Sequence, residues 1–108
     1  MLPTMQTLRI ALAQIAPRLG SIEVNLAMHF ERLSEARDRG ADLVVFPELG
    51  LTGYQLQDLA AEVAMRRDDP RLLALGSLTS GMSVVMGFVE RSDDEQLFIS
   101  AVLFEDGR

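Results

Sequence analysis

One carboxylate in this sequence stands at a position where α/β proteins place reacting groups. Residues 43–46 read Leu-Val-Val-Phe, and four large apolar residues in a row predict a strand covered on both faces. Pro47 has no amide hydrogen to give to a sheet, so we expect the strand to end there, with Glu48 just past its carboxyl end. Open α/β sheets bind their ligands at that end. Glu48 is therefore a candidate for acid–base chemistry, although strand-end carboxylates also commonly do no more than face water.

The segment after Glu48 is suited to folding closely around it. Gly50 and Gly53 can adopt backbone angles that other residues rarely take. Tyr54 follows directly and can turn back to hydrogen-bond Glu48 or line a pocket, while plain packing of its ring is an equally good interpretation. The whole string over residues 44–54, Val-Val-Phe-Pro-Glu-Leu-Gly-Leu-Thr-Gly-Tyr, resembles the glutamate segment of the nitrilase, or carbon–nitrogen hydrolase, superfamily.

The resemblance extends along the rest of the chain. Residues 10–14 (Ile-Ala-Leu-Ala-Gln), followed by Gly20 and Asn25, resemble the first strand and helix start of the superfamily. Residues 40–42 resemble its approach to the glutamate strand, and residues 84–88 (Val-Val-Met-Gly-Phe) resemble its next strand. The resemblance implies an α/β fold that is the first part of a four-layer α-β-β-α nitrilase-like sandwich. Residues 1–108 would then form the amino-terminal part of a single, incomplete domain.

The resemblance also implies a reaction. Members of the superfamily hydrolyse amides or nitriles with a cysteine that attacks carbon, a lysine that steadies the developing charge, and a glutamate that moves protons. By this resemblance Glu48 is the catalytic base, Tyr54 is a candidate substrate-pocket residue, and no metal or organic cofactor takes part. A base is needed because a free thiol is mostly protonated at neutral pH.

Two features of the sequence depart from a complete enzyme of this kind. The chain contains no cysteine, and its ten basic residues are all arginine, so the nucleophile and the lysine are both missing. Asp106-Gly107 is a strong hairpin signal after an alternating apolar run, yet only Arg108 follows it. These features predict the amino-terminal portion of a longer hydrolase, inactive as it stands, with the Lys and Cys beyond Arg108.

Three other interpretations stay open at this point. Gly53-Tyr54 followed by Asp58-Leu59 also resembles the glutaminase domain of glutamine-dependent NAD synthetases. A second possibility is a degenerate, non-catalytic association module that keeps the sheet and has lost the chemistry. A third is a hydrolase in which Glu48 serves another nucleophile. That hydrolase needs a Ser–His or Asp pair, and the single histidine, His29, offers none at a recognisable spacing.

The composition of the chain limits the kinds of partner that it is expected to bind. Ten basic against 16 acidic residues give a net charge of −6, and the basic residues are scattered, which argues against nucleic acid. No apolar run approaches the roughly 18 residues of a membrane span, and the amino terminus lacks a signal-peptide pattern. His29 has no partner at metal-ligand spacing and is interpreted as a surface or helix-packing residue. We expect a cytoplasmic homo-oligomer that acts on a small-molecule amide or nitrile.

The pattern of apolar residues predicts the elements around Glu48. We expect a buried strand over 8–15, a helix from the N-cap Ser21 to Gly40, and the strand 43–46 parallel to the first. Helical segments over 55–63 and 71–78 precede strands over 83–90 and 96–104. The chain thus supplies helices for only one layer. An apolar sheet face should stay in water and make the 108 residues oligomeric or prone to aggregate.

Overall fold

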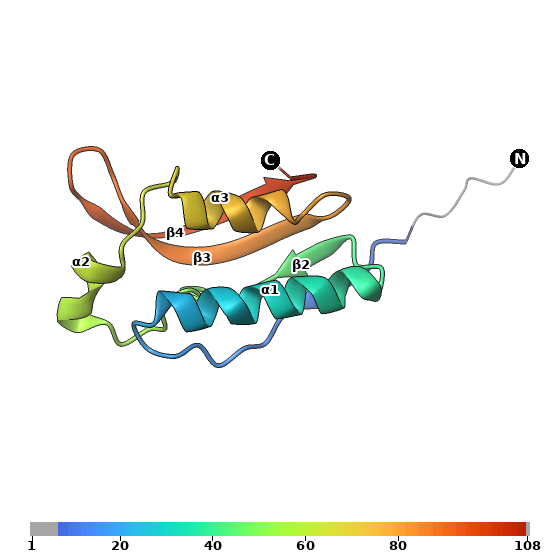
Figure 1. The fold of residues 1–108 in the computed structure, drawn as a ribbon, viewed down its shortest axis with the longest axis horizontal. Coiled ribbons are helices and arrows are strands. Elements are labelled where there is room, and N and C mark those ends of the chain that lie inside the picture. The colour runs from blue at the N-terminus through green and yellow to red at the C-terminus, as the bar shows by residue number, and fades with distance from the viewer. Residues whose placement is uncertain (1–6, 108) are drawn as a thin grey trace, which may run out of the picture.

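A computed structural model describes residues 7–107 as one sheet with helices packed against it (Figure 1). The helices and strands follow the order expected from the sequence. They are β1 (Ile10–Leu12), α1 (Ile22–Asp38), β2 (Leu43–Val45), the 3-10 turn η1 (Gln57–Leu59), α2 (Ala60–Val63), α3 (Pro70–Ser77), β3 (Ser83–Arg91) and β4 (Leu97–Glu105).

The strands form a four-stranded sheet in the order β1-β2-β3-β4. β1 and β2 are parallel, with Ala11 opposite Val44, which confirms the β-α-β unit predicted around α1. β2 and β3 are also parallel, with Val44 opposite Val84. β4 returns antiparallel beside β3 as a long hairpin. The carboxyl ends of the three parallel strands therefore lie at one edge of the sheet, and Glu48 follows the middle one.

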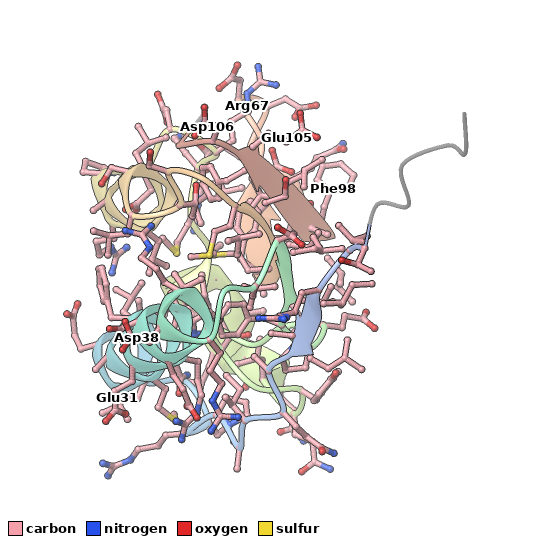
Figure 2. The ribbon with its side chains drawn as sticks, turned by 90° about the vertical axis from the view of Figure 1, so that its right-hand side faces the viewer. Glu31, Asp38, Arg67, Phe98, Glu105 and Asp106 are labelled. Carbon is pink, nitrogen blue, oxygen red and sulfur yellow. The ribbon has the colours of Figure 1, made fainter. Side chains whose placement is uncertain are left out.

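Both long helices cover the same face of the sheet. Figure 2 shows α1 and α3 stacked on one side of the strands, with Glu31 and Asp38 on the outer side of α1. The core lies between these helices and the sheet. It includes side chains with almost no exposed surface from every layer: Leu33, Val44, Leu72, Leu75, Val84 and Met86.

The second face of the sheet has no covering layer within residues 7–107. Alternation along the strands directs Ile10 and Leu12 of β1, and Ile99 and Leu103 of β4, to this face. Leu12 is 77% exposed and Ile99 is 65% exposed. The single layer of helices was predicted correctly. The predicted burial of residues 8–15 is wrong, because an apolar pattern shows what a strand can bury and not whether a neighbouring layer is present.

Several local boundaries differ from the prediction. The strand expected over 8–15 is limited to the three residues of β1, and α1 ends at Asp38. α1 begins after Ser21 as predicted, but the Ser21 side chain makes no capping hydrogen bond. Gly40 takes the predicted left-handed conformation (φ +73°) just beyond the helix. The helix expected over 55–63 is instead the 3-10 turn η1 followed by the four-residue α2. Gln57 has a φ of +45° there, which lies outside the right-handed helical region and breaks the helix.

Candidate active site at the end of β2

Glu48 lies on a tight turn that begins where β2 ends. The Phe46 amide still donates to the Val85 carbonyl of β3 at 2.9 Å, and Pro47 then has no amide hydrogen to continue the ladder. The Gly50 amide donates back to the Pro47 carbonyl at 3.1 Å, which closes a turn over Pro47–Gly50. The side chain of Glu48 is exposed. The structure therefore places this carboxylate just past the carboxyl end of a parallel strand, as the sequence predicted.

The loop that follows Glu48 is buried and hydrogen-bonded. The Leu49 carbonyl accepts from the amides of Thr52 (3.1 Å) and Gly53 (2.8 Å), and the Thr52 carbonyl accepts from the Gly20 amide at 2.8 Å. Leu49, Gly53 and Thr52 are all buried. Leu49 has a φ of +53°, a left-handed conformation that residues with a side chain rarely adopt. The exposed carboxylate thus projects from a backbone that is itself enclosed.

A glycine of β3 permits the turn to approach the sheet. A Cβ added to Gly87 would lie 2.5 Å from the Leu49 nitrogen and 3.1 Å from the Glu48 Cα. Side chains alternate along β3, and Val84, Met86 and Phe88 are buried toward the helices. The absent side chain of Gly87 therefore points to the second, uncovered face. Glu48 rests with its backbone against that face.

Helix α1 holds the same segment through Asn25, which is fully buried. Its Nδ2 donates to the carbonyls of Arg18 (2.8 Å) and Leu51 (2.9 Å), and its Oδ1 accepts from the Arg18 amide at 2.7 Å. One side chain therefore ties the helix to the loop before it and to the loop after Glu48.

His29 lies one helical turn beyond Asn25 and is also fully buried. Its Nδ1 is 2.7 Å from the Asn25 carbonyl oxygen, and its ring stacks on Phe46 with centroids 4.2 Å apart and planes at 20°. Its Nε2 is buried without a hydrogen-bond partner among the described residues. Burial lowers the pKa of His29 below its ordinary value, and the hydrogen bond to the Asn25 carbonyl opposes this shift in part. His29 is a helix-packing histidine, one of the two interpretations given from the sequence.

Tyr54 lies near the uncovered face of the sheet and is 59% exposed. Together with Leu49 it lines an open, mostly apolar cavity of about 220 Å³. β3 and β4 contribute Val89, Leu97 and Ile99 to the same cavity. The structure therefore brings Tyr54 to a hollow beside the turn that carries Glu48. The chemical roles of Glu48 and Tyr54 stay predictions.

The main cluster of basic side chains within residues 7–107 lies away from Glu48 and is largely paired with acidic residues. A polar depression of about 300 Å³ near the β3–β4 hairpin is lined by Arg66, Arg67 and Arg91. Two of these arginines bind Glu95, Arg66 at 2.6 Å and Arg91 at 2.7 Å, so much of their charge is already balanced. The described residues contain no group of three or more His, Cys, Asp or Glu side chains placed to hold a metal ion. None of their helices combines the length and apolarity needed to cross a membrane.

Comparison with known proteins defines the class. The model of the carbon–nitrogen hydrolase family matches residues 9–108, and the chain belongs to this family. Among curated proteins it is 41% identical over 106 residues to the glutamine-dependent NAD(+) synthetase of Thermotoga maritima, covering 95% of this chain and 18% of that protein. The corresponding synthetase of Acinetobacter baylyi is 31% identical over 103 residues, covering 95% and 19%. The chain thus spans about a fifth of the length of these relatives.

Solved structures agree with this placement. Glutamine-dependent NAD+ synthetase from Acinetobacter baumannii, in complex with ADP, superposes with a TM-score of 0.80 at 33% identity, covering 96% of this chain and 20% of that one. A glutamate-to-glutamine mutant of an amidase from Nesterenkonia sp. AN1, with acrylamide added at its active-site cysteine, gives 0.76 at 27% identity, covering 94% and 40%. The expected fold, the first part of a nitrilase-like α-β-β-α sandwich, is confirmed.

Sequence reasoning found Glu48 and Tyr54 but missed the residues that support the turn. Asn25 and His29 lie on the apolar stripe of α1 with Ile22, Leu26 and Leu33, and polar residues on such a stripe signal a buried role. Gly87 interrupts an apolar strand, and that signals a close backbone approach. These signals were present in the sequence. Only the folded structure shows that Asn25, His29 and Gly87 all contact the segment that carries or follows Glu48.

Proposed function

We propose that this chain supplies the amino-terminal part of a glutamine-hydrolysing domain in a glutamine-dependent NAD synthetase. Seven of the curated relatives it resembles, including those at 41% and 31% identity, are synthetases of this name. The observation that carries the chemical role is the placement of Glu48. Its exposed carboxylate stands on an enclosed turn at the carboxyl end of β2, where a substrate and a nucleophile from elsewhere can reach it.

In this proposal Glu48 acts as general base and then as general acid. It takes the proton of a cysteine thiol as the sulfur attacks the side-chain amide carbon of glutamine, and it returns that proton to the leaving nitrogen as the C–N bond breaks. Ammonia leaves and a thioester remains. Water then attacks the thioester with Glu48 taking its proton, and glutamate is released while the thiol is restored. The cysteine, and a lysine that steadies the oxyanion, must come from outside these 108 residues.

Tyr54 is proposed to line the substrate pocket. It stands beside the cavity formed with Leu49, and its hydroxyl can fix the orientation of a small polar substrate while the ring excludes water. In this proposal Glu48 transfers protons during the reaction and Tyr54 helps to bind the substrate.

The proposal is tested by expressing the native gene in full and changing Glu48→Gln, which keeps the shape and removes the base. Release of glutamate from glutamine should fall by about 10²-fold or more. NAD formation from added ammonia should stay, because that reaction does not need glutamine hydrolysis. Glu23→Gln, which changes an exposed carboxylate of α1, is the matched control. Hydrolysis within about threefold of the parent would show that Glu48 is not the base.

A second candidate function is a free-standing amidase or nitrilase that releases ammonia without using it. The superposition on the Nesterenkonia amidase favours keeping this candidate. It differs in its products: the full protein would hydrolyse a panel of small amides or nitriles and form no NAD from ammonia. A protein with neither activity would favour the non-catalytic association module.

A further inference from the structure

The turn that carries Glu48 is supported from two sides by residues that do not touch the carboxylate. We propose that His29 and Gly87 are positioning residues for Glu48: His29 supports the turn from helix α1 and Gly87 lets it rest on strand β3. Together they fix where the carboxylate stands above the sheet. This inference rests on the proposed role of Glu48 as a base.

The contact at Gly87 is between backbones and leaves no room to adjust. The atoms that a Cβ would meet are the Leu49 nitrogen at 2.5 Å, the Glu48 Cα at 3.1 Å and the Glu48 carbonyl carbon at 3.2 Å. Ordinary contact begins near 3.4 Å, and a backbone atom cannot rotate aside as the end of a side chain can. Gly87→Ala must therefore displace Glu48 itself. A displacement of about 1 Å at a catalytic group can lower the rate by about 10²-fold.

The contact at His29 supports the other end of the turn. A Cβ on Gly50 would lie 3.1 Å from His29 Nε2 and 3.2 Å from Cε1, so the imidazole edge is already against the Gly50 backbone. The ring orientation is fixed twice, by the 2.7 Å hydrogen bond from Nδ1 to the Asn25 carbonyl and by stacking on Phe46. A neutral ring that donates through Nδ1 presents an unprotonated Nε2 to the turn. His29 is a flat, oriented spacer between α1 and the turn.

The conformation of the turn explains why outside support is needed. Leu49 has a φ of +53°, and such strain persists where the surroundings hold the backbone in place. The side chain of Glu48 is exposed, so its own packing does little to fix it. Its position is set by the backbone of the turn, which Gly87 meets at Glu48 and Leu49 and which His29 meets at Gly50.

The test uses the full protein expressed from the native gene, with kcat and KM for glutamine hydrolysis measured beside thermal unfolding. Gly87→Ala and His29→Ala should each lower kcat by about 10-fold or more, with KM within about threefold of the parent. The double variant should be non-additive, because both changes act on one turn. Gly76→Ala is the matched control. Gly76 is a buried glycine of α3, and the nearest atoms that its Cβ would meet all belong to the Phe104 ring and none to the Glu48 turn.

The outcomes separate structural from positioning roles. Gly76→Ala should lower the unfolding temperature as the other variants do while keeping kcat within about threefold of the parent. The inference is overturned if Gly87→Ala and His29→Ala keep kcat, or if Gly76→Ala loses as much kcat at equal loss of stability. If Gly87→Ala does not fold, His29→Ala alone decides by the same criterion. An active Glu48→Gln protein would instead refute the proposed function, which is a different result.

Discussion

The two faces of this sheet are made from similar residues and have opposite surroundings. On the helix side Val44 and Val84 are completely buried under α1 and α3. On the other side Leu12 and Ile99, equally apolar, are largely exposed among the described residues. Glu48 and the cavity at Tyr54 belong to this second side. The comparison teaches that the covered face holds the chain together while the open face carries the candidate chemistry.

The largest expected difference between the two faces comes from replacing one leucine on each face with alanine and measuring the free energy of unfolding. Leu72→Ala removes a fully buried side chain of α3 and should lower the free energy of unfolding by about 2–5 kcal/mol. Leu103→Ala on β4 removes a half-exposed side chain and should change it by about 0.5 kcal/mol or less. Urea denaturation at low protein concentration measures both. Equal losses would show that the second face is also closed in solution.

The next largest effect on stability is expected from Asn25, the buried polar residue by which α1 holds the loop after Glu48. Asn25→Ala leaves the Leu51 carbonyl and the Arg18 amide without their hydrogen-bond partner, at a cost of about 1–3 kcal/mol. The Arg18 carbonyl keeps its hydrogen bond from the Ser21 amide at 3.1 Å. The loss should be concentrated near the Glu48 turn. Amide exchange should therefore rise at residues 18 and 49–53 more than in β4. A uniform rise along the chain would show that Asn25 is no special anchor of this loop.

The open face should govern self-association, as predicted for a homo-oligomer. At micromolar concentration the 108 residues should sediment as oligomers or aggregates, since exposed apolar faces and open strand edges recruit partners. Changing both Leu12 and Ile99 to Lys should weaken association by at least about tenfold in Kd. Leu73→Lys, on an exposed position of α3, is the control that should leave association unchanged. A parent chain that is monomeric with well-protected amides would refute this prediction.

The smallest expected effect is a pH dependence set by His29. Its pKa in the folded chain lies below the ordinary 6.5, so the unfolded chain binds a proton more readily. The stability that His29 contributes is therefore present above about pH 6.5 and is lost as pH falls toward the lower folded pKa, by at most about 1.4 kcal/mol per pH unit. His29→Leu should remove this slope. Since the sequence has one histidine, unfolding measured between about pH 7.5 and 5.5 isolates its contribution.

Local signals explain why much of the site was predictable. Pro47 ends β2 by its own chemistry, and the helical spacing of Ile22, Leu26 and Leu33 marks α1 without any knowledge of the fold. Glu48 could be placed from these neighbours alone. The family resemblance then gave it a role.

The errors came from contacts between segments distant in sequence. An apolar strand such as β1 has the same pattern whether or not a second layer covers it, so the exposure of Leu12 could not be derived from the sequence. His29 looked unremarkable because its partners, Phe46 and Gly50, belong to another element. Gly87 was recognised only as part of a strand, because the turn that packs against it follows β2, far away in the sequence.

The support of the Glu48 turn by Gly87 has a consequence for the order in which the chain folds. β3 and β4 are neighbours in sequence and pair over a long hairpin, whereas β1 and β2 share only three registered positions across the whole of α1. Pairing between near neighbours closes a shorter loop and loses less chain entropy, so the hairpin can form early. During synthesis the turn at Glu48 leaves the ribosome before the strand on which it rests. The Glu48 turn therefore cannot take its final position until β3 has been synthesised, and we expect the site to be among the last regions to become ordered.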